Sequence, residues 1–415
     1  MSARIATLGG LGRLGGQRLL SRLEGGAIEL HERGGRWSFG TPGADLRVRV
    51  DVHDDRAWTR LMRGSTGFGE GYVEGYWDTD DLVGLTRILA RNMPAIDRLR
   101  RRWHPVLGRL QRLAPLVPRN SRRGARSNIS AHYDLGNELF SSFLDRRLMY
   151  SCAYFPHEGA SLEDAQLAKL DRVCERLELA SGDHLLEIGT GWGGMAIHAA
   201  TEYGCRVTTT TISREQHAYA TRRVRELGLA ARVTVLDRDY RDLTGRFDKL
   251  VSIEMIEAVG WQYFDTFFRK CSELIEPDGL MLLQAIVIAD DAYEVEKASK
   301  SFANTHVFPG GCLPSERLIG GMIGSQTDMR PLWADDITPH YAETLRIWRE
   351  RFNQAAPGLS RGYDERFRRL WNFYLAFCEG GFRERRIRDL QLLFAKPEHH
   401  ARTAAAQGRG EPAMA

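Results

Sequence analysis

The chain has 415 residues, of which 43% are hydrophobic and 27% charged, and a formal net charge of +4. This balance excludes a disordered or fibrous protein and predicts a soluble globular protein of two or three domains. Six scattered cysteines without a C-x-x-C spacing argue against a zinc site or a secreted disulfide framework, so we expect no metal and a cytoplasmic location.

Residues 1–95 are predicted to form a small mixed domain. Residues 27–53 alternate apolar and polar side chains between Gly and Pro breaks, a pattern typical of short strands and turns. Residues 54–64 and 78–93 have helical periodicity, and the second segment begins with acids, which favour a helix N-terminus.

Residues 96–126 are predicted to be a basic linker punctuated by prolines. Ten arginines and no acid lie between Arg98 and Arg126. Such a block is as often a solvated linker or helix face as a binding element. Its functional interpretation is attraction to an anionic membrane surface, at about 1 kcal/mol per basic residue. Nucleic acid is the competing partner, but the sequence has no helix-turn-helix, zinc-finger or RNP motif, and we expect none.

From about residue 160 strands alternate with helices, which predicts an α/β fold with a doubly wound parallel sheet and helices on both faces. We assign residues 127–397 to this domain and 398–415 to a disordered tail. Helical insertions are expected between about 291 and 380. The predicted strands cover 183–191, 205–213, 231–240, 247–260 and 279–289, with a last edge strand at 387–397.

The stretch "LLEIGTGWGG" places Gly189, Gly191 and Gly193 where a strand leads into a helix. Glycines there let the backbone turn tightly and approach a ligand. A dinucleotide site would have an acid about 20 residues later, on the ribose. Here Glu187 precedes the glycines and the second strand ends without an acid, which favours S-adenosylmethionine (SAM).

Two glutamates, Glu254 and Glu257, lie toward the end of the predicted strand "FDKLVSIEMIEAVG". Ligands of open α/β sheets lie beyond the carboxyl ends of the strands, so both are candidates. We expect Glu254 to cap a helix or face solvent. Glu257 lies among apolar residues, so its charge should need a specific partner.

Seven motifs in this order resemble the cyclopropane fatty acid synthases of bacteria and their mycolic-acid-modifying relatives. They are "NISAHYDLGNELFSSFLD", "YSCAYF", "EIGTGWGG", "TISREQ", "DYRDL", "EMIEAVG" and "FPGGCLPS". The resemblance covers residues 125–395 and, more weakly, the N-terminal part through "GSTGFGEGYVEGYWDTDDL". It implies a class I SAM-methyltransferase fold, Rossmann-like with helical insertions, and a homodimer.

The resemblance also implies site residues. Tyr133, Tyr150 and Ser151 would close over SAM, and Gly189 and Gly191 would lie beneath it. Thr211 and Gln216 would contact the ribose in place of the usual acid, and Asp239 and Tyr240 would flank the adenine. Cys152 and Glu257 would line a small bicarbonate site with Ile286 and Tyr341. Where many synthases have a histidine this chain has Gln284, which can donate a hydrogen bond but cannot shuttle a proton near pH 7. Either neutral donors hold bicarbonate, or the base differs here, with Glu257 as a candidate.

The implied activity is transfer of the SAM methyl group to a double bond of an unsaturated phospholipid acyl chain, forming a cyclopropane. The rival product is a 10-methylene chain made from oleoyl lipid, which Gln284 suggests. Small-molecule N-methylation and a lipid-binding protein that has lost SAM are further alternatives. Aromatic faces would stabilise the cationic intermediate; the candidates are Tyr133, Tyr154, Phe155, Tyr341 and Trp348. The substrate lies in a bilayer, so we expect peripheral attachment to the inner face of the membrane.

Overall fold

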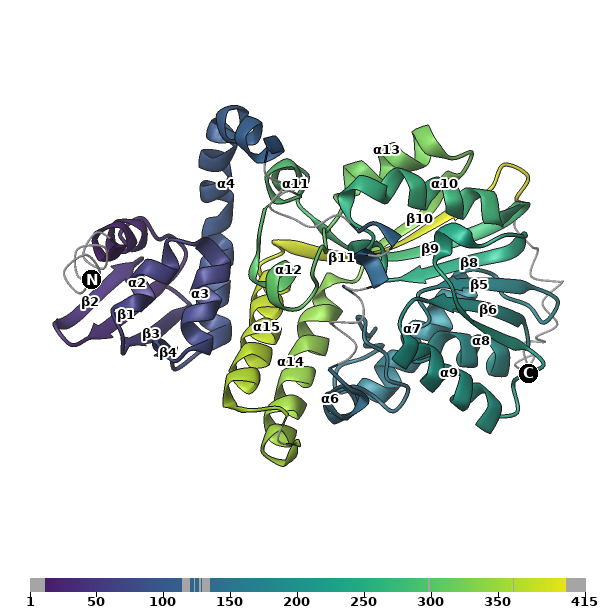
Figure 1. Ribbon diagram of the computed structural model, residues 1–415, viewed down its shortest axis with the longest axis horizontal. Helices are drawn as coiled ribbons and strands as arrows, with labels where there is room; N and C mark the ends of the chain where they lie inside the picture. Colours follow the sequence, from purple (N-terminus) through teal and green to yellow (C-terminus); the bar gives the residue numbers. More distant parts are fainter. Residues whose placement is uncertain are drawn as a thin grey trace, which may run out of the picture.

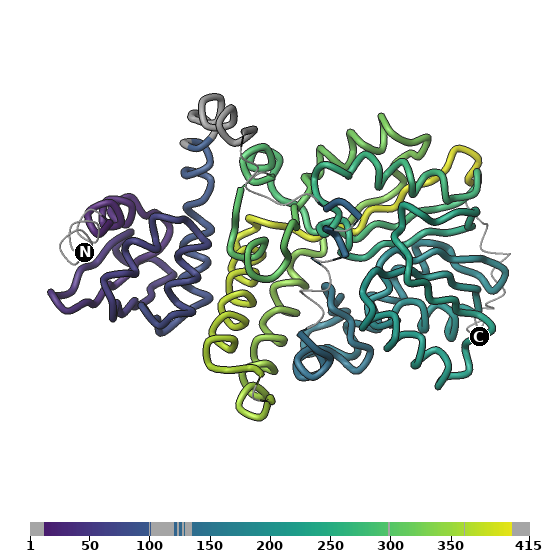
Figure 2. Tube along the Cα trace, viewed as in Figure 1, coloured from purple at the N-terminus to yellow at the C-terminus, as the bar shows by residue number. Residues whose placement is uncertain are grey.

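The computed structural model describes residues 12–113, 120–122, 124–126, 128, 135–297, 299–360 and 362–400, and for residue 99 and residues 101–113 the backbone alone. An N-terminal unit and a larger α/β unit lie side by side, with the long helix α4 between them (Figure 1). Figure 2 shows the chain passing from the small unit, at the left, to the large sheet. None of the helices in this described part is long and apolar enough to span a membrane.

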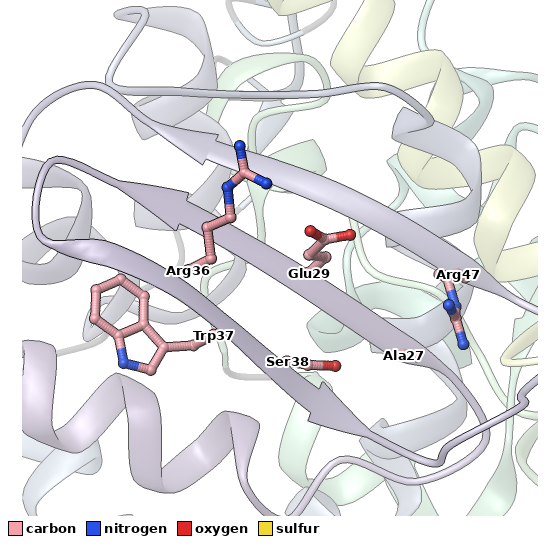
Figure 3. A pocket seen from close by; sticks show the side chains of 6 residues that line it. All are labelled: Ala27, Glu29, Arg36, Trp37, Ser38 and Arg47. Atoms are coloured by element: carbon pink, nitrogen blue, oxygen red, sulfur yellow. The ribbon is translucent and has the colours of Figure 1, made fainter.

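The N-terminal unit is built on a small sheet with one buried face. Its strand order is β2 (Gly35–Gly40), β1 (Ala27–Glu32), β3 (Arg47–Val52) and β4 (Trp77–Thr79), and the helices α2 (Arg56–Leu61) and α3 (Gly64–Val73) follow β3. Alternation along β1 and β3 buries Ile28, Leu30, Val48 and Val50, as the sequence pattern predicted. A shallow cavity of about 190 Å³ lies against this sheet, lined in part by Glu29, Arg36, Trp37 and Arg47 (Figure 3).

Helix α4 (Leu82–Leu113) is 32 residues long and crosses the expected domain boundary at residue 95. Residues 96–113, which we expected to be part of a linker, are its second half. The leucines and arginines that dominate this segment favour helix, and they outweigh the one proline within it, Pro105. The other expected domain bounds stay predictions, and the tail beyond residue 400 lies outside the described residues.

The large sheet confirms the predicted doubly wound fold. Its order is β10 (Arg330–Asp336), β11 (Ile387–Ala395), β9 (Ile275–Ile288), β8 (Phe247–Ile253), β5 (His184–Ile188), β6 (Arg206–Thr211) and β7 (Val233–Asp237). The strands from β9 to β7 are parallel, and β11 is antiparallel to both of its neighbours. The expectation that residues 387–397 form an edge strand is wrong, because β10 pairs with the outer side of β11.

Helices cover both faces of this sheet (Figure 1). Helices α10 (Phe264–Leu274) and α13 (Glu316–Gln326) pack on the face where β9 points Met281 and Leu283. Helices α7 (Leu162–Arg176), α8 (Gly194–Glu202) and α9 (Arg214–Glu226) pack on the face of Leu280 and Leu282. Burial of successive residues on opposite faces explains why β9 reads as a continuous apolar run.

The remaining helices lie between the two units. They are α6 (Asn137–Phe143), α11 (Asp290–Glu296), α12 (Phe302–His306), α14 (Thr338–Ala355) and α15 (Glu365–Arg383), with short 3-10 turns at 240–242, 256–258, 261–263 and 356–358. Helix α15 packs against α14 and against α4 (Figure 1). The Thr86 hydroxyl on α4 donates a hydrogen bond of 2.9 Å to the Ala376 carbonyl on α15. The inserted helices therefore connect the N-terminal unit to the carboxyl-end side of the sheet.

Candidate active site

A cavity lies at the carboxyl ends of β5, β6, β7 and β8, where the strand order reverses direction around β5. Ligands of doubly wound sheets bind at this switch point. The predicted cofactor residues that line it are Tyr150, Ser151, Gly189, Gly191, Thr211, Gln216, Asp239 and Tyr240. Tyr133 lies outside the described residues. The structure therefore brings eight of the nine predicted cofactor residues to one cavity.

The glycine turn after β5 forms the floor of this cavity. Gly189 has φ +107° and Gly191 φ +52°, conformations that side chains disfavour. A Cβ at position 189 would lie 3.1 Å from the Met255 side chain. The bare backbone here fits a cofactor that approaches the turn closely.

Glu187, the acid before the glycines, is buried beneath the same turn. It accepts a hydrogen bond of 2.6 Å from the Thr209 hydroxyl. Burial raises the pKa of Glu187 to about 8, against the opposing effects of Thr209 and Lys169. A buried carboxyl of this kind is stabilised in its charged form by a cation, so the site fits SAM, which carries a sulfonium and an ammonium, better than a phosphate-bearing cofactor.

Thr211 and Gln216 contact each other across the start of α9, with the Thr211 hydroxyl donating to the Gln216 amide oxygen at 2.9 Å. Asp239 is held by Arg241, whose Nη2 donates to it at 2.6 Å. Burial works to raise the pKa of Asp239, but the Arg241 guanidinium lowers it below its usual range. These groups would hold the neutral ribose and adenine of SAM.

Glu254, at the end of β8, accepts hydrogen bonds from three different segments. The Cys152 backbone N–H donates to its Oε1 at 2.7 Å, and the Gln284 side-chain amide donates to the same oxygen at 2.8 Å. The Tyr341 hydroxyl donates to Oε2 at 2.5 Å. The expectation that Glu254 caps a helix or faces solvent is wrong, because these donors draw its carboxylate into the site.

The backbone of Glu254 adopts φ +48°, in the left-handed region that favours glycine. Holding a residue with a side chain there costs about 1–2 kcal/mol. Strained residues of this kind gather at functional sites, where the surrounding contacts fix them. The three donors to the carboxylate are those contacts.

Two further carboxyl groups lie beside Glu254. Glu257 accepts a hydrogen bond of 2.6 Å from the Ile286 backbone N–H, and burial followed by the Glu254 charge raises its pKa to about 8. Asp389 on β11 receives a second N–H of the Gln284 amide at 3.1 Å. Burial raises the pKa of Asp389 well above its usual range, and the charges of Glu254 and Glu257 add to this. Burial raises the pKa of Glu254 as well, and the hydrogen bonds from Tyr341, Cys152 and Gln284, followed by the charge of Lys169, oppose this rise. Glu254 has the larger number of donors, so it is the group of the three that its neighbours stabilise most as an anion.

Cys152 is fully buried, and its Sγ–H donates to the Ala153 carbonyl at 3.2 Å. Burial raises the pKa of the Cys152 thiol well above its ordinary value, so the thiol stays neutral. We expected Cys152 and Glu257 to line one bicarbonate site, and this stays a prediction; the carboxylate that contacts the Cys152 backbone directly is that of Glu254.

Aromatic side chains surround this cluster on the side of the inserted helices. Trp348 stacks on Tyr150 with ring centroids 5.3 Å apart, and Tyr341 stacks on Phe382 at 4.2 Å. Tyr154 and Phe155, also candidates, pack instead against His340. Of the predicted aromatic residues that the structure describes, Tyr341 alone hydrogen-bonds Glu254.

The comparisons with known proteins agree with this site. The profile of the mycolic acid cyclopropane synthetase family matches residues 120–392. Tuberculostearic acid methyltransferase UfaA1 of Mycobacterium tuberculosis is 40% identical over 355 residues, which are 83% of this chain and 82% of that protein. The cyclopropane-fatty-acyl-phospholipid synthase of Escherichia coli K12 is 37% identical over 89% of this chain and 92% of its own.

Solved structures show the same fold. The cyclopropane synthase MmaA2 from Mycobacterium tuberculosis superposes with a TM-score of 0.62 at 29% identity, covering 68% of this chain and 99% of its own. The mycolic acid cyclopropane synthase CmaA1, solved with SAH and CTAB, has a TM-score of 0.60 at 29% identity, covering 65% and 98%. The cavity at β5 is thus a candidate SAM site in a chain of this fold.

Proposed function

The chain belongs to the mycolic acid cyclopropane synthetase family, whose members are SAM-dependent methyltransferases, and from this premise we propose its reaction. The protein transfers a methyl group from SAM to a double bond of an unsaturated acyl chain in a phospholipid. The product is a cyclopropane fatty acyl chain, as the name of the Escherichia coli relative supports.

The observation that carries the proposal is the position of the Glu254 carboxylate. It accepts hydrogen bonds from Cys152, Gln284 and Tyr341, three of the residues assigned to the expected bicarbonate site. We propose that Glu254 supplies the base that bicarbonate was expected to provide. This accounts for Gln284, since an amide that only orients a carboxylate needs no ability to carry a proton.

In the proposed mechanism the protein aligns two reactants and removes one proton. SAM, when bound, supplies an electrophilic methyl carbon. Alignment of the alkene with that carbon contributes on the order of 7–11 kcal/mol. As the new C–C bond forms from the alkene electrons, positive charge develops on the neighbouring chain carbon, where the aromatic rings of Tyr341 and Trp348 stabilise it and exclude water. Glu254 then takes a proton, and the electrons of the broken C–H bond quench the cation.

The reaction is tested with vesicles of dioleoyl phospholipid, SAM and the purified protein. We expect a product heavier by one CH₂ group whose proton NMR spectrum has the upfield signals of cyclopropane hydrogens. A sample that binds SAH but converts no unsaturated lipid would rule the proposal out. Fully saturated vesicles are the control, because they offer no alkene.

We propose the 10-methylene chain as a second candidate product, because the base in this protein is the Glu254 side chain and not a free bicarbonate ion. If Glu254 removes a proton from a neighbouring chain carbon instead of the added methyl, the product is the 10-methylene chain. The relative at 40% identity is named for tuberculostearic acid, which supports this alternative. Olefinic methylene signals in the same NMR spectrum identify it.

We also propose that the protein attaches to an anionic membrane surface through its N-terminal unit. In the basic block, Arg100, Arg122 and Arg126 pair with acids of the chain itself: Glu296, Asp242 and Asp237. Arg36 on β2 and Arg47 at the start of β3 line the shallow cavity of the N-terminal sheet (Figure 3). Both are exposed, and among the described residues no ion-pair partner of either is found. They suit lipid phosphate better than the paired arginines do.

Replacing Arg36 and Arg47 with serine should weaken binding to anionic vesicles at low salt by about thirtyfold, the combined effect of roughly 1 kcal/mol for each of the two basic residues. Arg269→Ser with Arg317→Ser, on the α/β unit, is the charge-matched control and should bind like the wild type. Equal binding of the two double variants in a vesicle sedimentation assay would contradict this surface.

A further inference from the structure

Lys169 on α7 is fully buried, although lysine is almost never found so without a partner. Its ammonium donates a hydrogen bond of 2.9 Å to the Ser151 hydroxyl. One turn earlier on the same helix, the Gln166 amide donates to the Ser151 carbonyl at 2.9 Å. Helix α7 therefore holds Ser151 at both its side chain and its backbone.

The held segment leads directly to the reacting centre. Ser151 lines the cofactor cavity, and the next residue, Cys152, gives its N–H to Glu254. A displacement of Ser151 would thus move both a wall of the cavity and a donor to the carboxylate. Lys169 lies behind this segment, away from the cavity lining.

Five acidic groups of the described chain interact electrostatically with Lys169. They come from the loop after α6, the Ser151 segment, β5, the end of β8 and β11: Asp145, Cys152, Glu187, Glu254 and Asp389. An ammonium taken out of water costs several kcal/mol unless a nearby anion compensates it. Burial lowers the pKa of Lys169, and the charge of Glu254 is the largest effect that opposes this.

We propose that Lys169 is a positioning residue for methyl transfer, whose buried ammonium keeps the Glu254 carboxylate ionised while its bond to Ser151 fixes the segment that orients that carboxylate. This rests on the proposed role of Glu254 as the base. One buried cation supports one buried anion, and Glu254 has the three donors that favour its charged form. Glu257 and Asp389 then remain protonated beside it.

The test compares Lys169→Met, which keeps the length of the side chain and removes the charge, with Lys169→Arg, which keeps the charge. A carboxylate that loses a neighbouring cation binds its proton more tightly, so the rising limb of the pH–rate profile should move to higher pH. In Lys169→Met we expect a shift of at least one pH unit, a loss of rate of about fivefold or more at the wild-type midpoint, and recovery toward the wild-type rate at higher pH. Lys169→Arg should keep the wild-type limb.

Lys396→Met is the matched control. Lys396, which directly follows β11, is also buried, but it pairs with Asp328. This variant should lower the melting temperature without moving the limb. The proposal would be overturned if the rising limb of the pH–rate profile were at the same pH in Lys169→Met as in the wild type. It would also be overturned if Lys396→Met shifted that limb as far as Lys169→Met does.

A measurement without lipid separates this inference from the proposed function and does not depend on the folding of the Lys169 variants. The infrared difference spectrum between the wild type and Glu254→Gln at pH 7 reports whether Glu254 is ionised. A carboxylate band supports the inference even where no lipid is methylated, in which case the proposed reaction alone fails. A protonated carboxyl band in the wild type overturns it.

Discussion

Replacement of Glu254 with glutamine is expected to slow methyl transfer by about 10²–10⁴-fold, the range for loss of a positioned general base. Glutamine has nearly the same shape, but its amide cannot accept a proton. Its NH₂ group would also face one of the three donors that now converge on the carboxylate. Binding of SAH, measured by calorimetry, should change little, because the glycine turn that receives it is untouched.

Glu254→Gly gives a sharper form of the same experiment. Glycine suits the left-handed backbone at this position and leaves a space among the donors from Cys152, Gln284 and Tyr341. Added bicarbonate or formate should fill this space and restore part of the lost rate. Glu178→Gly is the control, since Glu178 has φ +53° but lies at the end of α7, and it should remain fully active. A Glu254→Gly protein as active as the wild type without any added anion would show that Glu254 is not the base.

The core of the fold could be predicted because its strands and helices have distinct local patterns. The parallel strands β5, β8 and β9 are mainly apolar runs bounded by turn residues, and β6 is a run of β-branched threonines. The order of the glycine turn and these strands predicted a ligand site at the carboxyl ends, where the cavity lies. Strand β10 was missed because "RPLWADD" begins beside a proline and has no regular alternation; its half-exposed edge position requires none. Without β10, residues 387–397 had to be placed at the edge.

The candidate site was predicted where it follows the chain locally and missed where it depends on distant contacts. The glycine turn and its neighbours are successive loops at one edge of the sheet, so pattern and resemblance were sufficient. Glu254 meets Cys152 from 102 residues away, and nothing near either residue in the sequence indicates this contact. The one local signal was Gln284, whose inability to carry a proton indicated that another group must be the base.

Buried charges were the hardest features to predict. Asp389 lies within "IRDLQLLFA", where a single acid in a strand is typical of the solvent face. Lys169 follows "LEDAQLA" on an amphipathic helix, where a lysine is typical of the exposed side. Each is buried where a distant segment supplies its hydrogen-bond partner: the Gln284 amide donates to Asp389, and the Ser151 hydroxyl accepts from Lys169. Such contacts are a property of the folded chain rather than of either segment.

Replacement of Gly189 with valine is expected to weaken SAH binding by about 10–100-fold and to abolish methyl transfer at ordinary SAM concentrations. A β-branched residue at φ +107° is strongly strained, at about 1–3 kcal/mol, and its Cβ would press on the Met255 side chain at 3.1 Å. The turn can relieve the backbone strain and the contact with Met255 only by moving into the cavity. Gly182→Val, in the turn before β5, is the matched control, because a Cβ there meets nothing within 4 Å, and it should bind SAH like the wild type. Calorimetric titration of both variants decides the matter: equal affinities would mean that SAM does not approach this turn, and the alkene would then have no methyl donor beside Glu254.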